Sequence, residues 1–250
     1  MIRGLYTSTS GMLTQQLNMD VISNNLSNVE TNGYKKDTGV MSPFHRELLY
    51  HLDSTNILQS RLIGESAHGV QLSQVITSYG QGNIYQTGNP LDAAIDGDGF
   101  FVVQDGEEIK LTRNGSFKID SEDYLVTGEG YRVLGHGGFI IIEDEDFTIT
   151  GEGVLFEGDM EVDTLLLIDF ENKDNLDKDG HTLFSAPQDL IPVQPQFNIK
   201  QGYLERSNVN TAQEIADLIT TSKIYGANQR MVQSYDQILA QAVREIGNLK

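Results

Sequence analysis

The stretch Ser23-Asn24-Asn25-Leu26-Ser27-Asn28-Val29-Glu30-Thr31-Asn32-Gly33-Tyr34-Lys35-Lys36 decides the fold, because a long helix must end within it. Asn32-Gly33 supplies a residue free to take a positive φ, which is the usual way to stop a helix and turn the chain. Upstream, apolar residues recur at seven-residue and three-residue steps, as in the a/d stripe of a coiled coil: Leu5, Met12, Met19, Ile22, Leu26 and Val29. We therefore expect an N-terminal helix of about 28 residues, roughly 40 Å long.

The expected helix has apolar side chains on a second side as well. This second stripe lies about 100° or more around the helix axis from the first and consists of Tyr6, Leu13, Leu17 and Val21. Only three charged residues fall between Met1 and Thr31, namely Arg3, Asp20 and Glu30. A helix on the surface of a monomer normally has one apolar and one charged face. We therefore expect neighbours on both stripes, and contacts with other subunits on the second.

A second long helix is predicted at the C-terminal end. Thr211-Ala212-Gln213-Glu214 has the spacing of a capping box, in which a hydroxyl and a carboxylate satisfy free backbone N–H groups. Apolar residues then recur every seven positions: Leu218, Tyr225, Val232, Leu239 and Ile246. Tyr235, Ala242 and Leu249 fill the interleaved positions, and Ile224, Met231 and Ile238 form a flanking stripe. This pattern predicts about 37 helical residues, roughly 55 Å.

The middle of the chain has the composition of β-structure. Short runs of Val, Ile, Phe, Tyr and Leu alternate with glycine turns such as Asn114-Gly115. The candidate strands are Gly99 to Gln104, Leu111 to Arg113, Ser116 to Asp120, Tyr131 to Leu134, Phe139 to Glu143 and Thr164 to Phe170. Many short strands with close-set turns predict an antiparallel sandwich or open barrel.

We therefore predict an α+β chain in which the two terminal helices pair as an α-helical coiled coil around a central, antiparallel, all-β domain. The expected divisions are residues 1–36 for the first helix, 37–71 for an extended linker, 72–200 for the β domain and 201–250 for the second helix. Within the linker, the apolar segment Phe44 to Leu52 is a candidate short helix. The alternative is an ordinary α+β domain whose terminal helices cover a sheet. The near absence of charge on the first helix favours the coiled coil.

The charge of the chain is concentrated in its middle. The net charge is −19, and residues 92–189 carry 25 acidic and 6 basic residues, whereas the remainder carries 11 of each. Nucleic-acid binding is excluded, because phosphate contacts need clustered basic side chains. No apolar run approaches the ~18 residues that a membrane span requires, so no membrane insertion is expected. The N-terminus lacks the pattern of a cleavable secretory signal.

The sequence offers no convincing catalytic or metal-binding pattern. The five histidines lie on different segments, and cysteine is absent. Asn175-x-Asp177-x-Asp179-Gly180 matches the first half of a calcium loop, but Ala186 stands where a bidentate glutamate belongs, so we interpret it as a turn between strands. We expect no catalytic residue, no metal site and no cofactor, and hence a protein that is not an enzyme.

Four blocks in the same order resemble the axial proteins of the bacterial flagellum, the basal-body rod and hook family. The opening stretch is similar to that family's N-terminal signature at Asn24, Asn25, Leu26, Asn28, Gly33 and Tyr34. The other blocks run from Thr87 to Val103, from Leu111 to Gly135 and from Gln201 to Val209, the last followed by the long helix. The resemblance covers nearly the whole chain except residues 37–69 and 143–163.

The resemblance implies a structural subunit that polymerises helically into a hollow axial drive shaft and export channel. It implies terminal helices in an inner coiled-coil layer and a β domain outside them. The implied partners are other copies, other rod and hook subunits, the flagellar type III export apparatus and the ring or bushing proteins. The implied location is the basal body, in the periplasm or cell-wall space, reached without a cleaved signal peptide.

Chain length separates the members of that family. Hook proteins usually carry an extra outer domain and the smallest rod proteins lack the β domain, so 250 residues indicate a mid-sized rod subunit. Asn18 to Ile22 and Phe44 to Tyr50 look closer to the distal-rod type, whereas the length suits the proximal type at least as well. Two hypotheses from other classes are a cell-wall glycan-binding or hydrolysing protein that uses the acidic lobe, and a secreted coiled-coil adhesin.

Overall fold

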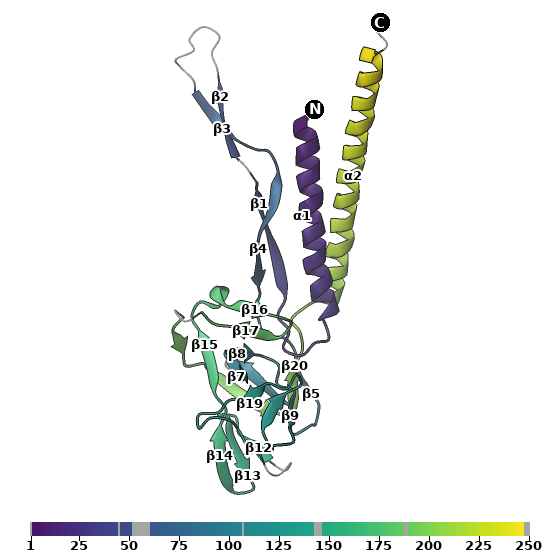
Figure 1. Cartoon of the computed structure of the whole chain (residues 1–250). Coiled ribbons are helices and arrows are strands. Elements are labelled where there is room, and N and C mark those ends of the chain that lie inside the picture. Colours follow the sequence, from purple (N-terminus) through teal and green to yellow (C-terminus); the bar gives the residue numbers. More distant parts are fainter. Residues whose placement is uncertain are drawn as a thin grey trace. The chain divides into compact units, whose positions relative to one another are not determined.

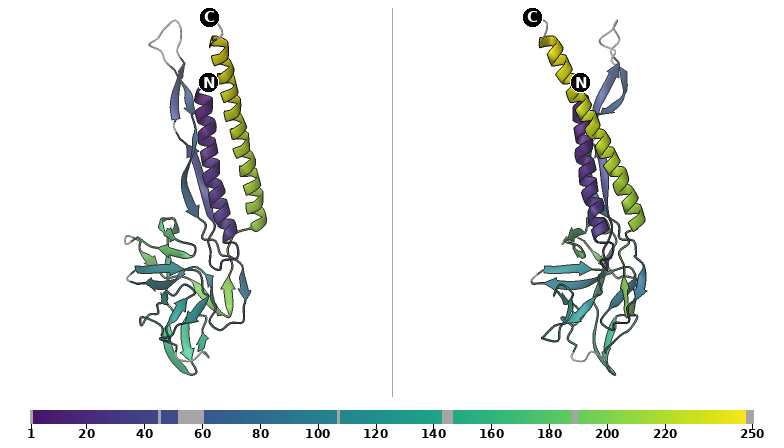
Figure 2. Two further views of the ribbon diagram at one scale, coloured as in Figure 1. Left: turned by 45° about the vertical axis from the view of Figure 1, so that its right-hand side comes forward. Right: turned by 90° about the vertical axis from the view of Figure 1, so that its right-hand side faces the viewer.

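A computed structural model describes residues 2–44, 46–51, 61–106, 108–142, 147–187 and 190–247 (Figures 1 and 2). The chain forms two compact units. The first, here called the helical unit, comprises Met1–Leu26, Asp37–Ile76 and Thr211–Lys250. The second, here called the β unit, comprises Ser27–Lys36 and Thr77–Asn210.

Two helices lie side by side in the helical unit. Helix α1 spans Ile2–Ser27 and helix α2 spans Thr211–Gly247. Helix α2 begins at the threonine of the predicted capping box and has the predicted 37 residues. The left view of Figure 2 shows the two helices side by side, and the right view shows that they cross at an angle. The predicted α+β fold, with paired terminal helices and central antiparallel sheets, is confirmed.

The segment between α1 and the β unit consists of four strands. Strand β1 (Asp37–Pro43) pairs with β4 (Val70–Thr77), and β2 (Arg46–His51) pairs antiparallel with β3 (Arg61–Ala67). The predicted short helix over Phe44 to Leu52 is therefore wrong where this segment is described. A nine-residue helix is marginal by itself, whereas β3 offers β2 a hydrogen-bonded ladder. His45 and Leu52 lie outside the described residues.

Among the described residues, the largest sheet of the β unit has nine strands, in the order β16-β17-β8-β7-β11-β10-β9, with β15 pairing with both β7 and β18. The strands are β7 (Phe100–Asp105), β8 (Glu108–Thr112), β9 (Phe117–Ile119), β10 (Leu125–Thr127), β11 (Arg132–Val133), β15 (Leu167–Phe170), β16 (Asp177–Asp179), β17 (Leu183–Ser185) and β18 (Pro192–Val193).

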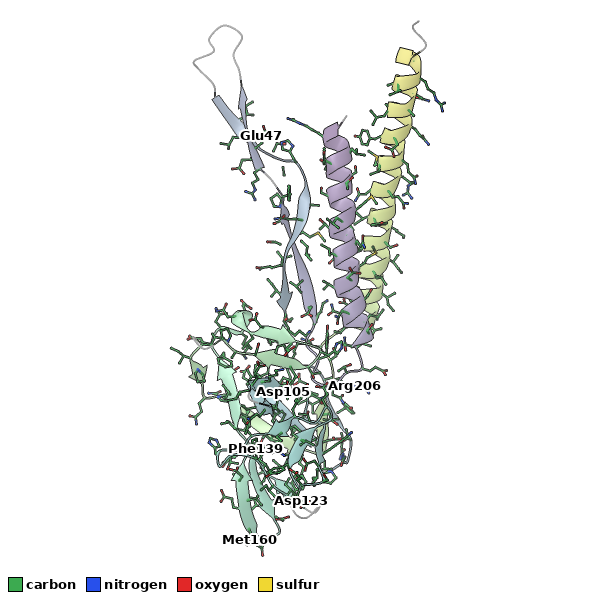
Figure 3. All side chains as sticks on the ribbon, in the orientation of Figure 1. Glu47, Asp105, Asp123, Phe139, Met160 and Arg206 are labelled. Atoms are coloured by element: carbon green, nitrogen blue, oxygen red, sulfur yellow. The ribbon has the colours of Figure 1, made fainter. Side chains whose placement is uncertain are left out.

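Three smaller sheets complete the β unit. Strands β12 (Phe147–Ile149), β13 (Val154–Glu157) and β14 (Met160–Thr164) form an antiparallel meander. Met160, the first residue of β14, is 74% exposed (Figure 3). Strand β6 (Ala93–Gly97) pairs with β19 (Phe197–Gln201), and β5 (Ile84–Gln86) pairs with β20 (Tyr203–Glu205).

Strand β7 is buried on both faces and organises the core. Phe101 and Val103 face one apolar cluster, which includes Phe117. Phe100 and Val102 face a second cluster, as the two-residue period of a strand requires. The rings of Phe101 and Phe117 meet edge to face, with centroids 5.1 Å apart.

The predicted strands are found with shifted ends, and two need correction. Phe139 and Ile141 make isolated bridges to Leu134 and Tyr124 rather than a continuous strand. The run from Thr164 to Phe170 is divided, because β14 ends at Thr164 and β15 begins at Leu167. The half calcium loop is the predicted turn, since Asp177–Asp179 and Leu183–Ser185 form the hairpin β16–β17.

Candidate functional site

The seam between α1 and α2 is built from small and polar residues. A methyl group at Gly4 would overlap the ring of Tyr235, and one at Gly11 would lie 2.9 Å from Nδ2 of Asn228. Seven residues further along α1, Asn18 Nδ2 donates to the Thr221 hydroxyl over 3.4 Å. Seven residues after that, Asn25 Nδ2 donates to Glu214 Oε2 over 3.2 Å. Positions 4, 11, 18 and 25 thus face 235, 228, 221 and 214. The helices are therefore antiparallel, with a seven-residue repeat in each.

The predicted apolar stripes flank this seam rather than fill it. On α1 and the turn after it, Ile22 is buried, and Leu5, Met12, Met19, Leu26 and Val29 are half-buried. On α2, Leu218, Tyr225 and Val232 are half-buried, and Leu239 is 37% exposed. The side chain of Ile246 lies outside the described part of the chain. Their contacts with other subunits stay a prediction.

A second side of α1 is tied to the strands by hydroxyl groups. Thr7 Oγ1 lies 2.9 Å from the carbonyl oxygen of His68, and Thr14 Oγ1 lies 2.8 Å from that of Val70. The backbone N–H of Val70 donates to Ser10 Oγ over 3.4 Å. These hydroxyl groups give the backbone of His68 and Val70 hydrogen-bond partners that an unpaired strand edge would otherwise lack. They therefore hold the start of β4 close beside α1.

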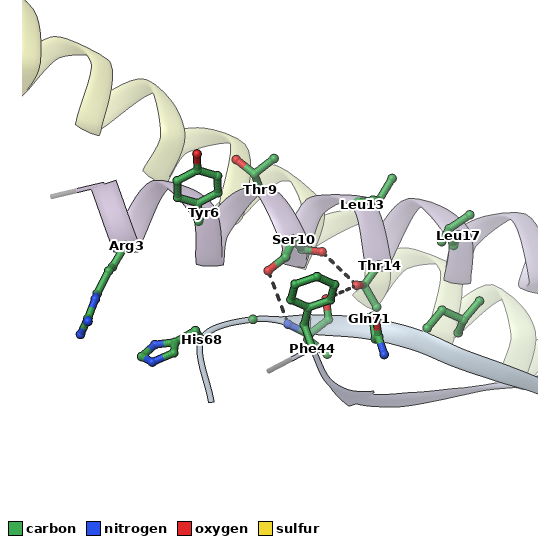
Figure 4. Close-up of a pocket in the computed structure, with 13 residues that line it drawn as sticks. Arg3, Tyr6, Thr9, Ser10, Leu13, Thr14, Leu17, Phe44, His68 and Gln71 are labelled. Carbon is green, nitrogen blue, oxygen red and sulfur yellow. Dashed lines mark hydrogen bonds between the residues drawn. The ribbon is translucent and has the colours of Figure 1, made fainter. Parts of the chain in front are cut away.

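The third side of α1 is apolar and exposed. Tyr6 is 70% exposed, Leu13 60% and Leu17 41%. Together with Phe44 and Leu72 from the strands they line a groove of about 720 Å³, here called the α1 groove (Figure 4). In Figure 4, Phe44 lies between α1 and the strands, below Ser10 and Thr14, whereas Leu13 is drawn at the upper edge of α1. Tyr6, Leu13 and Leu17 are three of the four residues of the predicted second stripe, whereas the fourth, Val21, is half-buried and does not line the groove.

The start of the signature, Asn24-Asn25, has one exposed and one buried side-chain amide. Asn24 is exposed, whereas Asn25 is 1% exposed. The Asn25 side chain donates to the carbonyl of Asp37 over 2.7 Å and accepts from the N–H of Asp37 over 2.9 Å. This two-point bond imitates a β-ladder and fixes the start of β1 against the end of α1, so both amide atoms of Asn25 are required.

In the β unit, the end of the signature forms a tight turn. Asn28 accepts at its carbonyl from the N–H of Thr31, and Gly33 follows with φ of +70°. A side chain at Gly33 would lie 2.5 Å from the carbonyl carbon of Arg113, so only glycine fits. Tyr34 is buried, with Nζ of Lys178 3.9 Å from its ring centroid.

Three charged side chains meet in the interior of the β unit, and we call them the buried ion cluster: Lys35, Arg113 and Glu205. Lys35 Nζ lies 2.6 Å from Glu205 Oε1, and Arg113 Nη1 lies 3.3 Å from Glu205 Oε2. The N–H of Gly82 also donates to Glu205 Oε1 over 2.7 Å. The Lys35 and Glu205 side chains are each 1% exposed, so water does not screen the pair.

Burial sets the electrostatics of this cluster. Loss of solvation lowers the pKa of Lys35 below its ordinary 10.5, and the negative charge of Glu205 opposes that shift. Burial likewise lowers the pKa of Arg113, again against the charge of Glu205. Lys35 also donates to the carbonyl of Gly80 over 3.0 Å, and Arg113 to that of Gly97 over 2.9 Å. The cluster therefore joins the signature turn, β8 and β20 in one network.

Sequence reasoning assigned no role to the buried ion cluster. Its members lie in three of the blocks that carry the resemblance, but they are 78 and 92 residues apart along the chain. The available signal was weak: Lys35 and Glu205 directly follow an aromatic or apolar residue, as Tyr34-Lys35 and Leu204-Glu205, but Arg113 stands between Thr112 and Asn114.

None of these arrangements resembles a reaction centre. Among the described residues, no group of three or more His, Cys, Asp or Glu side chains could hold a metal ion. The carboxylate of Asp179, from the half calcium loop, pairs with Lys110 over 2.8 Å. No helix in the described part of the chain is long and apolar enough to cross a membrane.

Comparison with known proteins agrees with this geometry. Family models described as flagella basal body rod protein, flagellar hook protein FlgE/F/G D1 domain and flagellar basal body rod FlgEFG protein C-terminal match residues 5–35, 94–156 and 200–245. The flagellar basal-body rod protein FlgG of Buchnera aphidicola subsp. Schizaphis graminum is 34% identical over 255 residues, which cover 96% of this chain and 98% of the relative. The chain belongs to the flagellar basal-body rod FlgE/F/G family.

Further relatives refine this membership. The FlgG rod protein of Bacillus subtilis is 32% identical over the full length of both chains, and that of Agrobacterium fabrum is 33% identical over 95% of this chain and 97% of its own. The predicted resemblance is confirmed, and the chain is a FlgG-like rod protein of the distal-rod type. The family is structural and not enzymatic.

Proposed function

We propose that this chain is a subunit that polymerises helically through its terminal helices into the hollow shaft of the flagellar rod. The shaft would transmit rotation and enclose an export channel. The β unit, which holds most of the acidic residues of the chain, would form the outer layer and face ring or bushing proteins. Export of the chain by the flagellar type III apparatus and contacts with other rod and hook subunits belong to the same proposal.

The exposed apolar faces of the helical unit carry this proposal. In one chain, Tyr6 and Leu13 on α1 are mostly exposed, and α2 exposes Ile224, Met231 and Ile238 by 44–49% each. Each such side chain gains about 1.5–3 kcal/mol when it is fully buried, so leaving both faces open is unfavourable for a monomer. A polymer in which copies surround one another covers them. Contacts of this kind are expected at Leu13, Leu17 and the α2 stripes.

The decisive experiment is electron microscopy of basal bodies from a strain that lacks this chain. We expect truncated rods and loss of motility, restored by the wild-type chain. The Leu13→Glu variant should not restore them, because the subunit contact would have to bury a carboxylate. Gln16→Glu adds the same charge at an exposed polar position of α1 and should restore both. Complete rods in the deletion strain, or full motility of Leu13→Glu, would contradict the proposal.

A further inference from the structure

The two helices of the pair are unequal in length, and α2 continues beyond the start of α1. Gly4 faces Tyr235, and α1 begins at Ile2, so α2 has lost its partner helix by about residue 238. The remaining residues 238–247, here called the overhang, extend roughly 15 Å further. Figures 1 and 2 show this end of α2 projecting past the N-terminus of α1.

The overhang presents apolar side chains that α1 cannot cover. Ile238 is 45% exposed, Leu239 37% and Val243 69%. Leu239 and Val243 are four residues apart, so they form one apolar face over a full helical turn. A solvent-facing helix end would ordinarily carry polar residues at these positions. The overhang therefore has the pattern of a helix end that packs against something outside its own chain.

The α1 groove can accommodate the overhang in length and in apolar character. From Arg3 to Leu17 the groove follows α1 for roughly 21 Å, which is long enough for the roughly 15 Å of the overhang. Its walls are largely apolar, with Leu13 and Phe44 facing the open space. Arg3, at one end of the groove, has its side chain 82% exposed and lies 3.9 Å from Glu47, and the overhang carries Arg244 and Glu245 side by side, so the match rests on length and apolar surface.

The overhang cannot fill the groove of its own chain. Measured along α1, the groove begins at Arg3 and runs toward Leu17, whereas the overhang leaves Gly4 in the opposite direction. A continuous α-helix does not fold back on itself without a break, and α2 is helical from Thr211 to Gly247. The occupant must therefore come from another molecule.

We propose that the α1 groove of one copy receives the overhang of a second copy, an inference that rests on the polymer proposed above. Groove and overhang are different surfaces of the same chain, so the contact is heterologous, and each added copy leaves one groove and one overhang unoccupied. Such a contact generates an open helical polymer unless its rotation closes a ring. It fixes which face of α1 meets which end of α2 in the neighbouring subunit.

Because the chain has no cysteine, site-directed cross-linking tests the contact cleanly. Two full-length variants, Leu13→Cys and Val243→Cys, are produced together in one flagellated strain, and basal bodies are isolated and treated with a thiol cross-linker. A dimer that contains one of each variant is expected. Neither variant alone should give it to the same extent. Separate chains carry the two cysteines, so a bond within one chain cannot form.

The matched control replaces Val243→Cys by Gln241→Cys. Gln241 is also exposed and lies about 160° around α2 from Val243, so it should point away from the groove and give only background cross-linking. Equal cross-linking from both positions, or none from Val243→Cys in basal bodies that contain the chain, would overturn the inference while the proposed function stands. Absence of the chain from purified basal bodies would instead remove the proposed function itself.

Discussion

Neutralising the carboxylate of the buried ion cluster should strongly destabilise the β unit. Glu205→Gln keeps the shape of the side chain but leaves the positive charges of Lys35 and Arg113 without a counter-ion. Lys35 Nζ is 2.6 Å and Arg113 Nη1 is 3.3 Å from the carboxylate in the native protein. Removing one partner from a buried pair costs about 3–5 kcal/mol. For a unit of this size that corresponds to a fall of about 6–20 °C in Tm.

The assay is thermal unfolding of the purified full-length chain, followed by circular dichroism in the near-ultraviolet. Glu122→Gln is the matched control, because Glu122 pairs with Arg132 over a similar 2.9 Å but is 66% exposed. An exposed pair contributes about 0–1 kcal/mol, so the control should lose little stability. Adding Lys35→Met to Glu205→Gln should recover part of the loss by removing one of the two orphaned cations.

The reasoning is refuted if Glu205→Gln and Glu122→Gln unfold at the same temperature. It is also refuted if the double variant is less stable than the sum of its single changes. Either result would mean that water or a rearranged side chain neutralises the cations, and that the cluster does not hold the signature turn against β8 and β20.

Three further predictions concern the two helices and the stability of the fold at acidic pH. Gly11→Leu should lower the helix content measured by far-ultraviolet circular dichroism, because the new side chain overlaps Asn228, whereas Gly226→Ala has room and should stabilise α2 by up to ~1 kcal/mol. Leu26→Asp should abolish rod assembly and motility, since it places a charge beside the helix seam; swimming cells with normal rods would contradict this. Lys173 hydrogen-bonds to Asp98 and lowers the pKa of that carboxyl, so the pair stabilises the fold above the ordinary Asp pKa of 3.8 and is lost as pH falls through the lower folded value. Lys173→Ala should therefore cost stability at pH 6 but little at pH 2, and because Asp98 is largely exposed the difference in Tm should be small.

The helices could be predicted because their signals are local. The apolar heptads and the Thr-x-x-Glu spacing act within a few residues, and α2 begins at the predicted threonine. Helix α1 ends at Ser27, earlier than the Asn32-Gly33 stop predicted, so Val29 lies in the turn that follows it. The exposed stripe at Tyr6, Leu13 and Leu17 was also foreseeable, because two apolar faces on one uncharged helix cannot both meet a single partner helix.

The seam itself was not predicted, for a physical reason. The seam residues of α1 are spaced as regularly as its leucines and methionines, but a hydrophobicity pattern does not detect glycine or asparagine at these positions: Gly4, Gly11, Asn18 and Asn25. Their role depends on close approach and on amide bonds across the pair, which become visible only when Tyr235, Asn228, Thr221 and Glu214 stand opposite.

The buried ion cluster and the strands of the β unit show a second limit. Lys35, Arg113 and Glu205 come from segments far apart in the chain, and no periodicity reveals which distant charges will meet. Several strands have only two or three residues, too few for alternation to be recognised, and their positions follow from the partners beside them. The predicted short helix over residues 44–52 was wrong for the same reason, because pairing with β3 determines the conformation of Arg46–His51, which forms β2.

The polar seam links the stability of the helix pair to the concentration of the protein. Glycine and side-chain amides bury little apolar surface between α1 and α2, so in the proposed polymer most of the free energy that orders the helices comes from neighbouring copies. By mass action, the temperature at which α1 and α2 melt should then rise with protein concentration, whereas the melting of the β unit should not. The helical structure of α1 and α2 would thus depend on the concentration of subunits and not on a single chain alone.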